Sequence, residues 1–220
     1  MNGNFKRKEL ITIIAAIKRL IDQQYAHPTG RFGTYIGEKM VRQHQPETEW
    51  TVNLLNVQQD DAILELGCGA GSAIKRLVHQ TTAKQVTGID SSFTMLRSVK
   101  RRNKDAVRSR RVNVLYGDLN KLAFPNNQFD KVFTIHTLYF WKNISGTLAD
   151  IYNVLKPGGH FVITFCDGKN DVTWNGVKDL VQNELLPSAK KYGFSDITFI
   201  EGPISRQFHT VAVIGYKPLN

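Results

Sequence analysis

From residue 62 onward, short apolar segments alternate with amphipathic ones, and this alternation limits the folds open to the chain more than any other feature. Strands are predicted over residues 62–66, 85–89, 112–116, 129–135 and 160–165. Helices are predicted between several of them, over residues 72–79, 92–102 and 147–155. Strand–helix–strand units with right-handed crossovers build a mostly parallel sheet with helices on both faces. We therefore expect an α/β fold.

The C-terminal part departs from this alternation. A helix is predicted over residues 177–192, followed by strands over 195–201 and 209–216. Because no helix separates these last two strands, they are expected to pair as an antiparallel hairpin. The whole pattern predicts a seven-stranded, mostly parallel sheet whose last strand is antiparallel.

The N-terminal part is predicted to be a helical lid or cap over residues 1–49, with the main domain at 50–220. Its apolar side chains recur at helical spacing from Leu10 to Ile21. Such a helix packs on the domain, covers a pocket or lies on a membrane. Pro28 and three glycines then interrupt the pattern between His27 and Gly37, which is typical of a mobile lid. Another helix is expected to lead through Trp50 to about Leu55.

No apolar run in the chain approaches the roughly 20 residues that a membrane span needs. Lys18 and Arg19 end the N-terminal apolar run before any cleavage site of an export signal. Cys68 and Cys166 form neither a CxxC pair nor a metal-ligand spacing, which favours a reducing compartment. The sequence therefore predicts a cytoplasmic protein.

A glycine-rich loop joins the first predicted strand to its helix, from Glu65 through Gly67, Gly69 and Gly71. Glycines there let the backbone turn sharply and let a ligand come close. Asp90 ends the next strand about 20 residues later, the place of an acid that accepts ribose hydroxyls. Ser72 breaks the dinucleotide fingerprint GxGxxG, and the carboxylate of Glu65 suits a ligand with a positive end. These features favour S-adenosylmethionine over a dinucleotide.

Five motifs in order resemble the class I S-adenosylmethionine-dependent methyltransferases, in the group that includes the ubiquinone and menaquinone biosynthesis enzymes. They are Glu65–Gly71, Gly88–Asp90, Tyr116–Leu119, Phe129–Val132 and Leu155–Gly159. The resemblance covers about residues 50–165. It implies a Rossmann-like fold, methyltransferase activity, S-adenosylmethionine as cofactor and S-adenosylhomocysteine as product.

The resemblance also implies roles for individual residues. Glu65, Gly67, Cys68, Gly69 and Gly71 would line the methionine end of the cofactor. Asp90 would bind the ribose, Ser91 and Met95 would flank the adenosine, Asp118 and Leu119 would contact the adenine amine, and Ile135 and His136 would lie beside the sulfonium.

Methyl transfer from a sulfonium chiefly requires alignment and exclusion of water, and it needs a base only where the acceptor loses a proton. His136 is predicted either as that base or as a hydrogen-bonding residue of the pocket, with Tyr35 as a second candidate base or clamp. Tyr139 and Trp141 are predicted to line the substrate site or to pack in the core. No metal site is expected, because the Asp and Asn ligands of catechol-type enzymes are not evident.

The net charge is +10, and basic residues crowd the stretch between Arg97 and Arg111. This stretch is either a phosphate-binding patch or a solvated face. A small-molecule acceptor is the leading hypothesis. RNA, an anionic membrane lipid and a non-catalytic cofactor-binding role remain alternatives, and no sequence feature indicates an oligomeric state.

Overall fold

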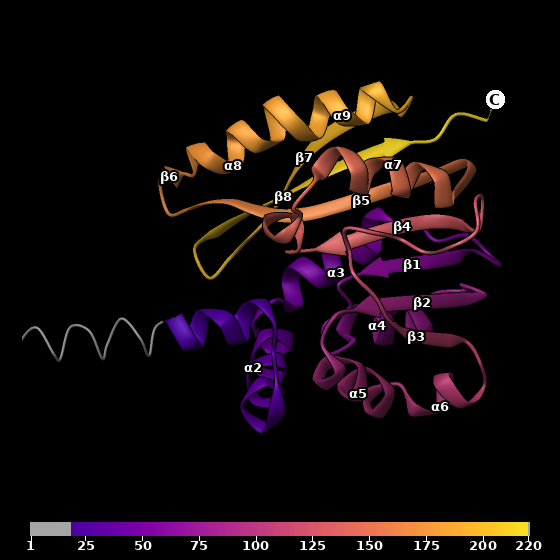
Figure 1. The fold of residues 1–220 in the computed structure, drawn as a ribbon, viewed down its shortest axis with the longest axis vertical. Helices are drawn as coiled ribbons and strands as arrows, with labels where there is room; N and C mark the ends of the chain where they lie inside the picture. Colours follow the sequence, from indigo (N-terminus) through magenta and orange to yellow (C-terminus); the bar gives the residue numbers. More distant parts are fainter. Residues whose placement is uncertain (1–18, 220) are drawn as a thin grey trace, which may run out of the picture.

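The computed structural model describes residues 19–219, which fold around one twisted sheet (Figure 1). The strands follow the order β3-β2-β1-β4-β5-β8-β7, with β6 paired to β5. The first five pair in parallel as predicted, and they are β1 (Ala62–Leu66), β2 (Gln85–Asp90), β3 (Val112–Tyr116), β4 (Phe129–Ile135) and β5 (Leu155–Lys169). The Rossmann-like fold class is confirmed.

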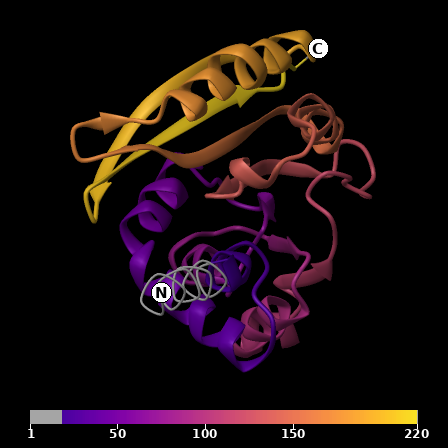
Figure 2. The same ribbon diagram turned by 60° about the vertical axis from the view of Figure 1, so that its left-hand side comes forward.

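The C-terminal strands close the sheet as an antiparallel hairpin, which confirms the prediction for the tail. β7 (Ser195–Ser205) and β8 (Phe208–Tyr216) pair with each other, and β8 is also antiparallel to β5. A short strand that the sequence pattern did not predict, β6 (Val172–Thr173), adds to the edge of β5. Figure 2 shows the last helices lying along these long strands.

Helices cover both faces of the sheet, and each face has its own apolar core. One face carries α3 (Gln45–Leu54), α4 (Ser72–Gln80), α5 (Phe93–Arg102) and α6 (Lys104–Arg108). The other carries α7 (Ile144–Val154) and the continuous helical segment α8 (Asn175–Leu180), η2 (Val181–Leu185) and α9 (Leu186–Lys191). Alternate residues of β1 enter opposite cores, as the two-residue period of a strand requires: Ile63 packs on the first face and Leu64 on the second.

The glycine-containing segment after Pro28 is a helix and not an irregular stretch, and its role as a lid stays a prediction. Helix α2 runs over Gly30–Gln43. Its start is fixed to α5, because the Ser92 hydroxyl donates to the Pro28 carbonyl and the Gly30 N–H donates to Thr94 Oγ1 at 3.1 Å. A Cβ on Gly37 would lie 2.6 Å from Met95 Cε. Gly37 therefore serves close helix packing rather than looseness.

Most of the predicted N-terminal apolar stripe, from Leu10 to Ile17, lies outside the described residues. Residues 19–26 are helical. Helix α3 runs across position 49, and the division into a cap at 1–49 and a domain at 50–220 stays a prediction. Within residues 19–219, no helix combines the length and apolarity that crossing a bilayer requires.

Replacement of Gly71 by alanine is expected to destabilise the fold by about 2–4 kcal/mol. Gly71 has φ +78°, and an added Cβ would lie 2.9 Å from Val99 Cγ1 and 3.1 Å from Val99 Cα. A left-handed conformation and overpacking each cost roughly 1–2 kcal/mol or more. Gly176→Ala is the matched control, because that site has negative φ and free space around it. Equal free energies of unfolding in urea for the two variants would contradict this role of Gly71.

Candidate functional site

A cavity of about 940 Å³ opens where the parallel strands reach their carboxyl ends, the usual ligand position in such sheets. Most residues predicted for cofactor and acceptor lie together on its wall. They are Glu65, Gly67, Cys68, Gly69, Asp90, Ser91, Met95, Asp118, Leu119, Ile135, His136 and Tyr139.

The glycine loop forms one wall of this cavity, and its backbone is fixed to the neighbouring strand. The N–H groups of Gly67 and Cys68 both donate to the Ile89 carbonyl, at 2.9 and 3.0 Å. Gly67 and Gly69 have φ of +72° and +48°, a backbone conformation that residues with a side chain rarely adopt. A Cβ added at Gly69 would meet no other described atom within 4 Å. Gly69 therefore exposes bare backbone to a ligand.

Asp90 fixes the same loop from the end of β2. Its Oδ2 accepts the Gly69 N–H at 2.9 Å, and its Oδ1 accepts the Ser92 N–H at 2.8 Å. Burial raises the pKa of Asp90, while these two N–H groups act in the opposite direction. Each carboxylate oxygen keeps capacity for a further hydrogen bond, so Asp90 is able to accept hydroxyl groups from the cavity.

Glu65 is a buried carboxyl on the cavity wall, with 4% of its surface exposed. Its Oε2 finds no hydrogen-bond partner among the described residues. Burial, and after it the charge of Asp90, raises the pKa of Glu65 well above its ordinary value. An unpaired buried carboxyl is costly unless a ligand completes it, and a cation is the chemical match.

His136 also lines the cavity, directly after β4, in a left-handed conformation with φ +59°. Its backbone N–H donates to the Thr164 carbonyl at 2.8 Å, which fixes the bend. Burial, and after it the neighbouring His44, lowers the pKa of His136 to about 3. His136 is therefore neutral at physiological pH, and a base with so low a pKa holds a proton only weakly.

The structure does not bring Tyr35, Gly71 or Trp141 to the described wall of the cavity. Tyr35 is 57% exposed and its ring stacks on Phe32. Trp141 is buried in the core, where its Nε1 donates to Thr137 Oγ1 at 3.2 Å. The structure therefore gives no support to Tyr35 as a base or to Trp141 as a substrate contact.

Sequence reasoning missed several residues near the cavity, and three of them carry charge or titrate. His44 and Arg206 line its wall, and Glu47 lies fully buried next to His44. The available signal was the spacing His44-x-x-Glu47, which places both side chains on one face at the start of a helix. No local pattern links this pair to Arg206, which comes from the turn between β7 and β8.

The basic stretch is partly engaged within the fold. Arg102 donates to the Ala70 carbonyl and pairs with Glu38 at 2.6 Å, and Arg101 lies 3.6 Å from the same carboxylate. Figure 1 places α6 at the end of the sheet opposite to α2. This arrangement favours the reading of the stretch as a largely solvated face.

Replacement of Tyr139 by phenylalanine is expected to destabilise the protein by about 1–3 kcal/mol. The pairing of β4 with β5 ends at Thr164, and beyond it the Tyr139 hydroxyl accepts the Cys166 N–H at 2.6 Å and donates to the Cys166 carbonyl at 2.7 Å. Phenylalanine leaves both backbone groups unpaired. Tyr116→Phe, at a 60% exposed side chain, is the control, and equal chemical denaturation midpoints for the two variants would refute this bridging role.

Comparison with known proteins agrees with this geometry. The methyltransferase domain family matches residues 64–163, which include the glycine loop, Asp90 and His136. The uncharacterized methyltransferase YdaC of Bacillus subtilis is 29% identical over 161 residues, covering 73% of this chain and 86% of YdaC. The demethylmenaquinone methyltransferase of Leptospira interrogans is 39% identical over 101 residues, covering 46% of this chain and 41% of that enzyme.

Solved structures give the same result for the fold. Phosphoethanolamine N-methyltransferase 2 of Haemonchus contortus, in complex with phosphomonomethylethanolamine and S-adenosylhomocysteine, superposes with a TM-score of 0.64 at 19% identity. The match covers 78% of this chain and 52% of that one. The domain match and the curated relatives together support a class I S-adenosylmethionine-dependent methyltransferase, and the solved structures agree with that fold.

Proposed function

We propose that this protein transfers a methyl group from S-adenosylmethionine to a small-molecule acceptor held in the 940 Å³ cavity. One observation carries the proposal. A nucleoside-type wall, formed by the glycine loop and Asp90, and a wall of histidine and aromatic side chains enclose the same space. Donor and acceptor would therefore meet in one cavity, which is what an in-line transfer requires.

The residues of the first wall fit S-adenosylmethionine. The unpartnered Oε2 of Glu65 suits its ammonium group, and the bare backbone at Gly69 leaves room for its methionine part. The free capacity of the Asp90 oxygens suits the two ribose hydroxyls. When bound, the cofactor supplies a methyl group on a positively charged sulfur.

In this proposal the protein aligns the cofactor with the acceptor and excludes water from the reacting groups. Asp90 and Glu65 would fix the two ends of the cofactor, and Met95 and Leu119 offer apolar surface between which an adenine ring fits. Ile135 and His136 would then lie at the methyl group. Exclusion of water by such a wall strengthens every polar interaction inside the cavity.

The second wall favours a small acceptor over RNA or a lipid surface. Aromatic side chains from several elements enclose it, including Tyr139, Phe140, Trp174 and Phe208. The names of the relatives give sterols, a demethylmenaquinone and a phosphoethanolamine as acceptors, which are small molecules and not nucleic acids. The nucleic-acid alternative rests on charge, and the membrane alternative on charge and the amphipathic N-terminal helix. The basic stretch lies on α5 and α6, and two of its arginines pair with Glu38. A non-catalytic role differs from this proposal in binding cofactor without turnover.

Calorimetric titration of the purified protein is expected to give micromolar binding of S-adenosylmethionine and S-adenosylhomocysteine, and none of NAD. Asp90→Ala is expected to weaken binding by about 10–100-fold, since two hydrogen bonds to a charged group are lost. Asp105→Ala, which removes an exposed acid on α6, is the control and leaves affinity unchanged. Circular dichroism confirms that both variants fold. Unchanged affinity of folded Asp90→Ala would refute the placement of the ribose.

Cofactor binding is also expected to release a proton from Glu65. Burial raises its pKa, so the free protein carries a protonated fraction, and an incoming ammonium favours the carboxylate. The apparent binding enthalpy should then differ between phosphate and Tris buffers, and affinity should rise with pH. Glu65→Gln should bind more weakly and lose most of the buffer dependence. Identical enthalpies for the wild type in both buffers would rule out this proton release.

A further inference from the structure

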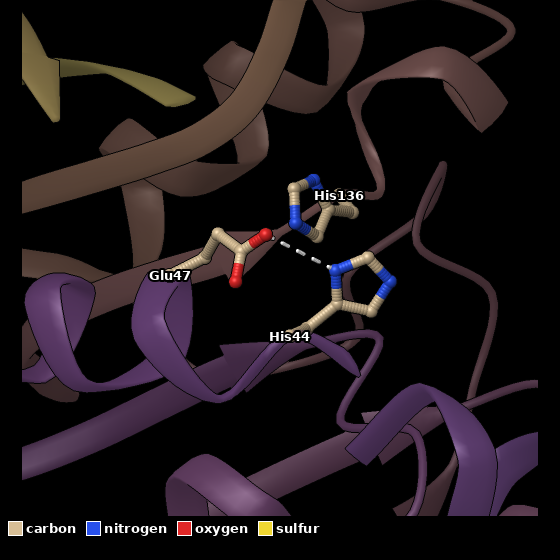
Figure 3. A group of neighbouring side chains, drawn as sticks. All are labelled: His44, Glu47 and His136. Atoms are coloured by element: carbon tan, nitrogen blue, oxygen red, sulfur yellow. Dashed lines mark ion pairs between the residues drawn. The ribbon is translucent and has the colours of Figure 1, made fainter. Parts of the chain in front are cut away.

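A cluster of titratable side chains lies at the edge of the cavity, apart from the glycine loop and Asp90. It consists of His44, Glu47 and His136. His44 immediately precedes α3, Glu47 lies in its first turn and His136 follows β4. One ligand-type atom from each lies within 4.8 Å of those of the other two. Figure 3 shows the two imidazole rings and the carboxylate directed toward one another.

The polar atoms of this cluster are unusually poorly satisfied. Glu47 is 0% exposed, and neither of its carboxylate oxygens has a hydrogen-bond partner within the described chain. The same holds for the buried Nε2 of His136. The nearest ion-pair contact of Glu47 is His44 Nδ1 at 3.5 Å. Buried polar groups without hydrogen bonds are costly, so a ligand that bonds these atoms would complete the arrangement.

From this geometry we infer that His44, Glu47 and His136 bind a divalent first-row transition metal ion. Two imidazoles and one carboxylate are a donor set of catalytic zinc and non-haem iron sites. Metal–ligand bonds of about 2.0–2.2 Å place ligand atoms roughly 3–3.5 Å from one another, so atoms now within 4.8 Å of one another would have to move closer on binding. His44 and His136 line the cavity, with Glu47 behind them, so the ion's remaining positions face the cavity.

Arg206 is the cation that now balances Glu47. Its Nη2 lies 3.9 Å from Glu47 Oε1 and 3.3 Å from His44 Nδ1, and its Nε donates to the Gln43 carbonyl. Arg206 lies in the turn between β7 and β8, with 37% of its side chain exposed. A metal ion and this guanidinium repel each other, so Arg206 competes with the metal and its removal should strengthen metal binding.

The position of the proposed metal ion also indicates which chemical class of acceptor the enzyme uses. This inference rests on the proposed function. A divalent ion beside His136 binds an acceptor hydroxyl and lowers its pKa, with the released proton passing to water. The resulting oxygen attacks the methyl carbon as the carbon–sulfur bond breaks. The electron pair of that bond remains on sulfur, which leaves a neutral thioether. The inferred acceptor is therefore an alcohol or a phenol.

Titration of the chelator-treated full chain with Zn²⁺ tests the site without reference to activity. One ion per chain is expected to bind in the wild type, at least tenfold more weakly in Glu47→Gln and in His136→Ala, and more tightly in Arg206→Gln. His79→Ala, which removes an exposed histidine at the end of α4, is the control and should bind as the wild type does. Thermal unfolding of each variant confirms that it is folded.

Absence of binding in both the wild type and Arg206→Gln, or equal affinity in Glu47→Gln and the wild type, would overturn the metal site. S-adenosylmethionine titrated into the same preparations separates the two proposals. Normal cofactor binding without zinc binding would remove the metal and leave the proposed function, and zinc binding without cofactor binding would do the reverse.

Discussion

The bond between the Gly69 N–H and Asp90 Oδ2 is the contact on which the cofactor wall depends. It joins the loop after β1 to the end of β2, two segments that the parallel pairing of their strands already brings together. The second oxygen of Asp90 holds the Ser92 N–H and so sets the start of α5. One buried carboxylate thus fixes the glycine loop and the first turn of a helix relative to each other. The same group faces the cavity, so fold and binding share it.

Packing around α5 extends this constraint to the N-terminal helix. Ser92 holds the Pro28 carbonyl, and Gly37 lets α2 approach Met95 closely. Met95 and His27 both line the cavity, so the docking of α2 on α5 completes its wall. An N-terminal segment that reads as loose in sequence is therefore part of the site. Gly37 lets α2 pack close to α5. Composition alone does not show whether a glycine serves close packing or flexibility.

The strands were predictable because a buried parallel strand leaves a local trace, an apolar run such as residues 129–135, whose bounds agree with β4. β5 extends from Leu155 to Lys169, beyond the predicted 160–165. Residues 166–169 are drawn into the strand by pairing with β8, which is distant in sequence, and Leu155 pairs with Phe129 of β4. The cofactor wall was predictable for the same local reason, since glycine loop and acid lie in one strand–helix–strand unit. His44 and Glu47 at the start of α3 and Arg206 in the turn between β7 and β8 are far apart in sequence, and only the folded sheet brings them together.

The buried carboxyl groups indicate the chemistry of the ligand more clearly than the net charge of the chain does. Glu65 lies at 4% exposure on one side of the cavity, and Glu47 lies at 0% exposure behind the other. Within residues 19–219, each has at least one oxygen without a hydrogen bond, a cost that a fold normally avoids. A chain with a charge of +10 has ample cations for pairing them, yet Glu65 Oε2 has no partner, and Glu47 is approached only loosely, by His44 at 3.5 Å and Arg206 at 3.9 Å. The proposed ammonium at Glu65 and the proposed metal ion at Glu47 would each supply positive charge to a buried carboxyl that the chain itself pairs poorly.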